Sequence, residues 1–228
     1  MLYWSLAIAP VVIILIFIYV KDKYNKEPLQ VLIRCFLGGA AAILPIYLLN
    51  LLTGLLDGYF GYKGQIVYDS FVQAALVEES VKFIILILMI WRSKYFDEKF
   101  DGIVYSVFVS MGFALIENIL YVTAGGLGVG LLRAFTTVPA HAIFGISMGY
   151  YVGLAKFDVE KRKVYLALAF SLSIVLHGFY NLILMIGASI LLLGFIFYVI
   201  FLYNYGIKKI NELYKFKLKT DSDKTDNY

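Results

Sequence analysis

Seven long apolar runs restrict what this chain can fold into more than any other feature of its sequence. Most of them reach the roughly 20 residues that a helix needs to cross a hydrocarbon core of about 30 Å, and the first and last are slightly shorter. They lie at residues 3–20, 29–52, 66–91, 102–122, 131–154, 164–186 and 189–205. The pattern predicts an all-α, polytopic transmembrane helix bundle of about seven spans.

Composition agrees with this class. Hydrophobic residues make up 61% of the chain and charged residues 16%, whereas soluble domains have about 45–50% and about 25%. The only cysteine, Cys35, excludes an intrachain disulfide and a multi-cysteine zinc site. The first run has no basic region before it and no small-residue cleavage motif after it, so we expect a retained helix rather than a cleaved signal peptide.

Lysine and arginine predict the orientation, because basic loops stay on the cytoplasmic side. Three loops and the C-terminal segment are basic, and they alternate with loops that hold only Lys63 or no basic residue. The basic residues are Lys21, Lys23, Lys26, Arg92, Lys94, Lys99, Lys156, Lys161, Arg162, Lys163, Lys208, Lys209, Lys215, Lys217 and Lys219. We expect a multi-pass cell-membrane protein with its N-terminus outside and its C-terminus inside.

The chain shows no internal repeat and no second domain. We expect residues 1–210 to form one transmembrane catalytic domain and residues 211–228 to form a polar, disordered cytoplasmic tail. Four glycines at 125–130 predict an outer loop between the fourth and fifth helices. Gly145, Gly149 and Gly153 recur every four residues, which lets a neighbouring helix approach closely.

Three ionisable residues interrupt the third apolar run: Glu78, Glu79 and Lys82. A charge at the bilayer centre costs roughly 2.5–3.5 kcal/mol on insertion scales, so such residues usually have a function. Glu78 and Lys82 share a helix face at i,i+4, and a neutralised structural ion pair is one interpretation. It leaves Glu79 without a role, because successive helical residues differ by about 100° in direction.

Other polar residues fall inside the fourth, fifth and sixth runs. They are Glu117, Asn118, Arg133, Thr137, His141, His177 and Asn181, and they include the only two histidines. Pro139 is expected to free the carbonyl of Phe135 and to kink the fifth helix.

These residue types favour hydrolysis. A carboxylate can take a proton from water, an imidazole can stabilise an oxyanion or protonate a leaving amine, and an amide can orient either. Two histidines and a glutamate are also the ligands of many hydrolytic zinc sites. The cofactor is therefore either none or one divalent metal such as zinc, and spacing does not separate the two.

Other protease signatures are missing or weak. The chain has no His-Glu-x-x-His and no Gly-x-Gly-Asp. The segment Gly145-Ile146-Ser147-Met148-Gly149 matches Gly-x-Ser-x-Gly, but the pattern lacks its strand-turn-helix context, and packing already explains its glycines. A serine mechanism is therefore disfavoured.

Five short motifs together resemble the PrsW family of intramembrane proteases and, more distantly, the type II CAAX prenyl endopeptidases and bacteriocin-processing enzymes. The motifs are Glu78-Glu79-x-x-Lys82, Asp101-Gly102-Ile103-Val104-Tyr105, Gly112-Phe113-Ala114-x-x-Glu117-Asn118, His141-x-x-x-Gly145 and His177-Gly178-x-x-Asn181. The resemblance implies an intramembrane endopeptidase acting on a membrane-anchored, anti-sigma-factor-like protein.

The same resemblance implies that Glu78 and Glu79 are the catalytic carboxylates, with His177 and Asn181 holding the oxyanion or the water. Glu117 stands where the CAAX-type enzymes have a histidine. The expected site therefore comprises Glu78, Glu79, Glu117, His141, His177 and Asn181.

The expected partners are the protein substrate and the lipid bilayer, with no nucleic acid. A proton-coupled transporter is an alternative, although the two related halves common in transporters are not found. A non-enzymatic scaffold is another, although it would need no such set of residues.

Overall fold

The structure is a computed structural model that describes residues 2–22, 26–187 and 189–225. Within these ranges the chain forms helices and no strand, which confirms the all-α prediction. A short 3₁₀ turn at Gly54–Leu56 and a π-helical segment at Asp69–Leu76 accompany nine α-helices in the described chain. The α-helices are α1 Leu2–Lys21, α2 Leu29–Ala41, α3 Ile43–Thr53, α4 Gly61–Tyr68, α5 Val77–Ile90, α6 Lys99–Phe135, α7 Thr137–Phe157, α8 Arg162–Ile186 and α9 Ser189–Thr225.

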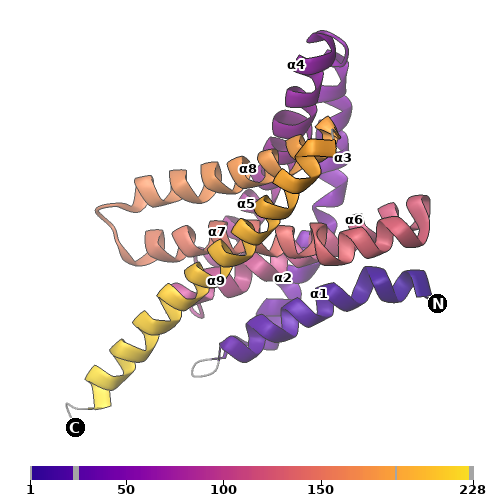
Figure 1. The fold of residues 1–228 in the computed structure, drawn as a ribbon. Helices are drawn as coiled ribbons and strands as arrows, with labels where there is room; N and C mark the ends of the chain where they lie inside the picture. The colour runs from indigo at the N-terminus through magenta and orange to yellow at the C-terminus, as the bar shows by residue number, and fades with distance from the viewer. Residues whose placement is uncertain (1, 23–25, 188, 226–228) are drawn as a thin grey trace.

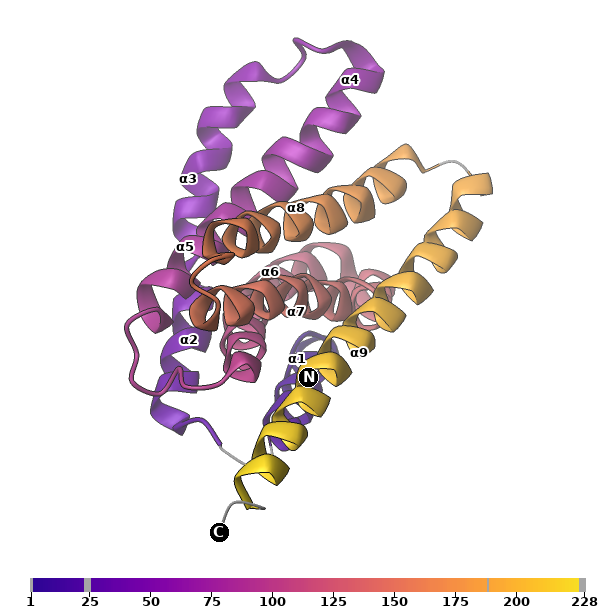
Figure 2. The ribbon, with the colours of Figure 1, turned by 90° about the vertical axis from the view of Figure 1, so that its left-hand side faces the viewer.

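Helix α7 lies at the centre of the bundle, where it packs against α6 and α8 (Figure 2). Helices α3 and α4 project away from this centre, and α9 crosses the bundle obliquely (Figure 1). Gly102 of α6 lies so close to Gly149 and Gly153 of α7 that an added Cβ would collide with their backbone. The predicted close packing of the α7 glycines is therefore confirmed.

The third apolar run is one continuous helical stretch with two geometries. Residues Asp69–Leu76 are π-helical, and α5 begins directly after them at Val77. The Ser70 hydroxyl donates to the Ile66 carbonyl across 2.7 Å at the start of this segment. Segments of π-helix are rare and often lie at functional sites, and this one ends at Leu76, two residues before Glu78.

The glycine-rich segment expected as a loop is instead part of helix α6, so that prediction is wrong in extent. Only Gly126 leaves helical geometry, with φ of 71° and ψ of −159°. The chain doubles back there, because Arg133 Nη2 lies 2.7 Å from Glu117 Oε2, whereas sixteen residues of straight helix would separate them by about 24 Å. Positive φ is tolerated by glycine, so one residue replaces a loop.

The expected interruption near Pro139 is present. Thr136, with φ of −122° and ψ of −62°, separates α6 from α7 and leaves Pro139 in the first turn of α7. The first N–H groups of a helix have no partner within it, so proline is tolerated there. The carbonyl of Phe135 instead accepts a hydrogen bond from the Tyr203 hydroxyl of α9 at 3.2 Å.

Four described segments are long and apolar enough to cross a membrane. They are Trp4–Lys21, Leu29–Leu56, Lys99–Phe157 and Arg162–Ile186. The third contains the reversal at Gly126 and the break at Thr136, so it includes two of the predicted apolar runs. The count of about seven spans and the N-out, C-in orientation stay predictions.

The polar tail expected from residue 211 also stays a prediction. Helix α9 extends to Thr225. Residues 226–228 of the tail lie outside the described residues.

Candidate active site

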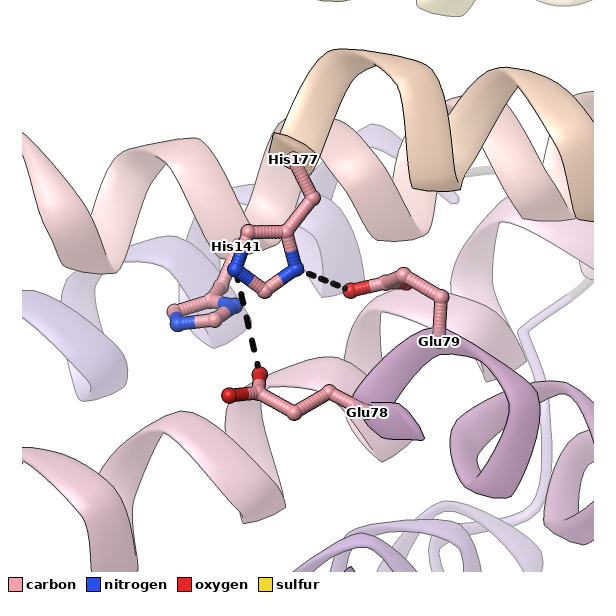
Figure 3. Close-up of side chains that lie close together, drawn as sticks. All are labelled: Glu78, Glu79, His141 and His177. Carbon is pink, nitrogen blue, oxygen red and sulfur yellow. Dashed lines mark hydrogen bonds and ion pairs between the residues drawn. The ribbon is translucent and has the colours of Figure 1, made fainter. Parts of the chain in front are cut away.

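The two neighbouring glutamates lie in the first turn of α5 and are both buried, with Glu78 8% exposed and Glu79 fully buried. Both carboxylates approach the ring of His177 from α8 (Figure 3). Nδ1 of His177 lies 2.9 Å from Oε1 of Glu79, and Nε2 lies 3.9 Å from Oε2 of Glu78. The imidazole therefore stands between the two carboxylates.

The second imidazole comes from α7 and completes the cluster. The rings of His141 and His177 lie 5.2 Å apart, at an interplanar angle of 86°. Phe144 stacks on His177 with the ring centroids 4.8 Å apart, and Phe113 meets His141 edge-on at 5.5 Å. Aromatic packing thus restrains both imidazoles.

Glu78, Glu79, His141 and His177 can each offer one ligand atom within 4.8 Å of the others. Oε2 of Glu78 and Oε2 of Glu79 are buried and have no hydrogen-bond partner among the described residues. Buried polar atoms without a partner are rare, and each calls for an explanation such as a bound ion. A divalent metal would satisfy these oxygens, and two imidazoles with a carboxylate are a common zinc donor set. The residues therefore fit a metal.

The contacts of Lys82 also agree in part with the alternative interpretation, a structural ion pair with the glutamates. Its fully buried ammonium lies 2.6 Å from Glu79 Oε1 and 3.6 Å from Glu78 Oε2. It also lies 3.5 Å from Nδ1 of His141 and over the Phe113 ring. Lys82 contacts both carboxylates but leaves one oxygen of each without a hydrogen bond, so neutralisation accounts for only part of the cluster.

Glu117 stands behind His141 rather than in the cluster of four. Its Oε2 accepts a hydrogen bond from Arg133 at 2.7 Å and lies 2.9 Å from Nε2 of His141. If the Nε2 proton of His141 faces Glu117, its Nδ1 lone pair faces the cluster. A carboxylate that orients an imidazole in this way is common behind metal ligands.

Asn118, a polar residue in the fourth apolar run for which the sequence predicted no role, connects Arg133 to helix α1. Its Oδ1 accepts from Nε of Arg133 at 2.9 Å, and its Nδ2 donates to the Ala7 carbonyl at 3.2 Å. The orientation of Arg133, and through it that of Glu117, therefore depends on the first helix.

A cavity of about 250 Å³ gives access to the cluster. Its lining includes Glu78, Glu117, His141, His177 and Asn181. All expected site residues except the fully buried Glu79 thus face one space. Asn181 lines this cavity but does not belong to the cluster of four ligand residues.

Tyr180 also lines the cavity and was missed by sequence reasoning. Its hydroxyl lies 2.8 Å from the hydroxyl of Thr137 and 3.1 Å from that of Thr136. Tyr180 lies three residues after His177 on the same face of α8, and this spacing could have identified it from the sequence. Ser147, by contrast, pairs with the Tyr205 hydroxyl at 3.0 Å and does not line this cavity.

Buried carboxylates and imidazoles at a cavity, within a bundle of membrane-length helices, are the features of a membrane-embedded hydrolase. Residues 27–205 match the model of the family described as "PrsW family intramembrane metalloprotease". The chain belongs to this family and is an intramembrane protease.

Named relatives cover most of the chain. It is 43% identical to "Protease PrsW" of Clostridioides difficile over 213 residues, which are 91% of this chain and 89% of the relative. It is 40% identical to "Protease PrsW" of Geobacillus kaustophilus, with 79% of each chain covered. It is 36% identical to that of Bacillus subtilis, with 90% of this chain and 92% of the relative covered. No solved structure matches.

Proposed function

We propose that this chain hydrolyses a peptide bond of a membrane-anchored protein at the cluster of Glu78, Glu79, His141 and His177. The observation that carries the proposal is the meeting of two imidazoles with two carboxylates that each keep a buried oxygen without a hydrogen bond. A buried oxygen without a hydrogen bond lowers the stability of the fold. It becomes useful where the site binds a metal, a water molecule or a substrate.

We assign Glu78 as the carboxylate that takes the proton from the attacking water. Glu78 lines the cavity, whereas Glu79 is fully buried behind it. A general base has to reach the water within hydrogen-bond distance, so the carboxylate at the cavity is the better placed. The proton can then pass from Glu78 to the leaving amine.

Glu79, His141 and His177 are the residues that would hold a divalent metal such as zinc. A metal bound there would polarise the scissile carbonyl and activate water. The chain's own residues prepare this donor set: Glu117 orients His141, and Phe144 holds the ring of His177. The buried Lys82 ammonium offsets the negative charge of the carboxylates.

The substrate class follows from the family and from the position of the site. A membrane-anchored protein of the anti-sigma-factor type, cut at or near the cell membrane, is the proposed substrate. We further propose a multi-pass topology with the N-terminus outside. The cavity is lined by residues of α5, α6, α7 and α8, and we propose that a substrate segment reaches it between these helices.

The test uses purified full-length protein in detergent with a single-span membrane protein as substrate. Glu78→Gln keeps the side-chain volume and removes the base, so cleavage should fall by about 10²–10⁴-fold. Thermal unfolding should stay close to that of the wild type. Glu160→Gln, an exposed glutamate in the α7–α8 connection, is the matched control and should cleave normally. Full activity of Glu78→Gln would refute the assignment.

A further inference from the structure

A second concave surface lies between α2 and the end of α5, away from the active-site cavity. This groove encloses about 780 Å³ and is lined by residues of α2, of α5 and of the segment that follows α5. Three of its lining residues are cations: Arg34, Arg92 and Lys94. No aspartate or glutamate lines it. The groove therefore carries positive charge without an opposing carboxylate.

The three cations are exposed and available to a ligand. Among the described residues, no ion pair involves Arg34, Arg92 or Lys94. The Lys94 ammonium lies over the Tyr95 ring, 4.9 Å from the ring centroid. Exposed guanidinium and ammonium groups of this kind bind phosphate oxygens well.

The other half of the groove is apolar. Leu37 is 58% exposed and Met89 is 40% exposed. Leu37 follows Arg34 by about one helical turn on α2, and Met89, near the end of α5, lies three residues before Arg92 in the segment that follows this helix. Gly38 lies at the floor of the groove, where an added Cβ would meet the end of the Met89 side chain. Each side of the groove thus pairs a cation with an exposed apolar side chain.

We propose that this groove binds one anionic phospholipid. Its phosphate lies among Arg34, Arg92 and Lys94, and an acyl chain lies along Leu37 and Met89. A free phosphate ion would use only the basic half, and a zwitterionic lipid would bring its own positive charge toward three cations. Arg92 and Lys94 also lie in a loop predicted to face the cytoplasm, and basic pockets between helices there are typical sites for anionic headgroups.

The test measures lipid retained by purified full-length protein in mild detergent, with native mass spectrometry and thermal unfolding as readouts. Phosphatidylglycerol should be retained as a single adduct and should raise the unfolding temperature. Phosphatidylcholine and inorganic phosphate should do neither. Removing all three charges in the variant Arg34→Gln/Arg92→Gln/Lys94→Gln should weaken retention on the order of 100-fold, or about fivefold for each cation.

The control variant Lys161→Gln/Lys163→Gln/Lys208→Gln removes the same charge from exposed positions outside the groove and should retain phosphatidylglycerol normally. Equal loss in both triple variants would show general attraction to anionic lipid and would overturn the proposal. Equal binding of phosphatidylcholine, or stabilisation by phosphate alone, would overturn it as well. If the groove variant unfolds, the single variants Arg34→Gln and Lys94→Gln provide the comparison. Each should then lose about fivefold.

Discussion

Two groups of acidic residues, here the upper and the lower cluster, lie apart in this molecule, and only the upper one has the features of a reaction site. Glu78 and Glu79 meet two histidines at a cavity, whereas Glu27, Asp97 and Asp101 meet at the end of the bundle. In both groups the potential ligand atoms lie within 4.8 Å of one another. Proximity of carboxylates therefore does not distinguish a catalytic cluster from a structural one.

The two clusters differ in the groups that contact their carboxylates. Oδ2 of Asp101 accepts the backbone N–H groups of Glu98, at 2.6 Å, and of Asp97, at 3.1 Å, which caps the start of α6. The Tyr105 hydroxyl donates a hydrogen bond to Glu27. Backbone N–H groups and a phenol thus contact this cluster, although Oδ1 of Asp101 has no hydrogen-bond partner among the described residues. The upper cluster instead holds two imidazoles and reaches a cavity. A cap stabilises a helix end, and an acid-base site needs access to water.

The largest expected contrast between the two clusters is in catalysis. The His177→Ala variant should insert and fold normally. Its cleavage rate should fall by about 10²–10⁴-fold, and it should bind less metal. Asp101→Asn should cleave at a near-normal rate per folded molecule but be less stable by about 1 kcal/mol. Cleavage assays, metal analysis and thermal unfolding of both variants measure this. If Asp101→Asn lost cleavage as fully as His177→Ala, the division between the clusters would fail.

A smaller effect is expected at Glu117, which sharpens the boundary of the upper cluster. Glu117→Gln keeps the volume but weakens the orientation of His141, so cleavage and metal affinity should each fall about 10–100-fold. Metal affinity is measured by competition with a chelator, independently of cleavage. Complete inactivation with unchanged metal affinity would place Glu117 among the groups that contact the substrate.

The lower cluster should instead respond to pH. Burial raises the pKa of Glu27 from 4.5 to about 7, with the charges of Asp22 and Asp97 adding to the increase. Because the folded state holds this proton more tightly, stability is lost as the pH rises from about 4.5 to about 7.

Glu27→Gln should flatten this fall in stability, as followed by thermal unfolding between the two pH values. Glu160→Gln, whose side chain is exposed, should keep the wild-type pH dependence. A Glu27→Gln profile identical to that of the wild type would remove Glu27 as the source of the effect.

The smallest effect is expected at Ser147, which belongs to neither cluster. Its hydroxyl pairs with Tyr205, so Ser147→Ala should cost only about 1 kcal/mol of stability and leave cleavage near normal. The assay is the same substrate cleavage. Complete loss of activity in a folded Ser147→Ala protein would favour the serine mechanism that the structure disfavours.

The sequence predicted the upper cluster well because charge is informative inside an apolar helix. Glu78, Glu79, His141 and His177 stood out as polar residues in runs that should contain none, and the fold brings them together. The lower cluster gave no such signal. Glu27 and Asp97 lie in segments between the apolar runs, where carboxylates are ordinary.

Backbone geometry was predicted less well. Four glycines at 125–130 indicated a loop, but a single positive φ at Gly126 is enough to reverse the helix. The π-helical turn before Glu78 depends on how α8 packs against it, which no local pattern contains. Glu117 was expected to act in catalysis, and only its distance to His141 indicates that it orients that residue.

The position of Lys82 also matters while the protein is being synthesised. Helix α5, with both glutamates, leaves the ribosome before α7 and α8, which carry the two histidines. In the predicted topology, in which this helix spans the membrane, the carboxylates enter it without their imidazole neighbours, and unpaired charge there is costly. Lys82 lies three residues after Glu79 and four after Glu78 on the same helix. Both glutamates can therefore contact this cation as soon as α5 has formed.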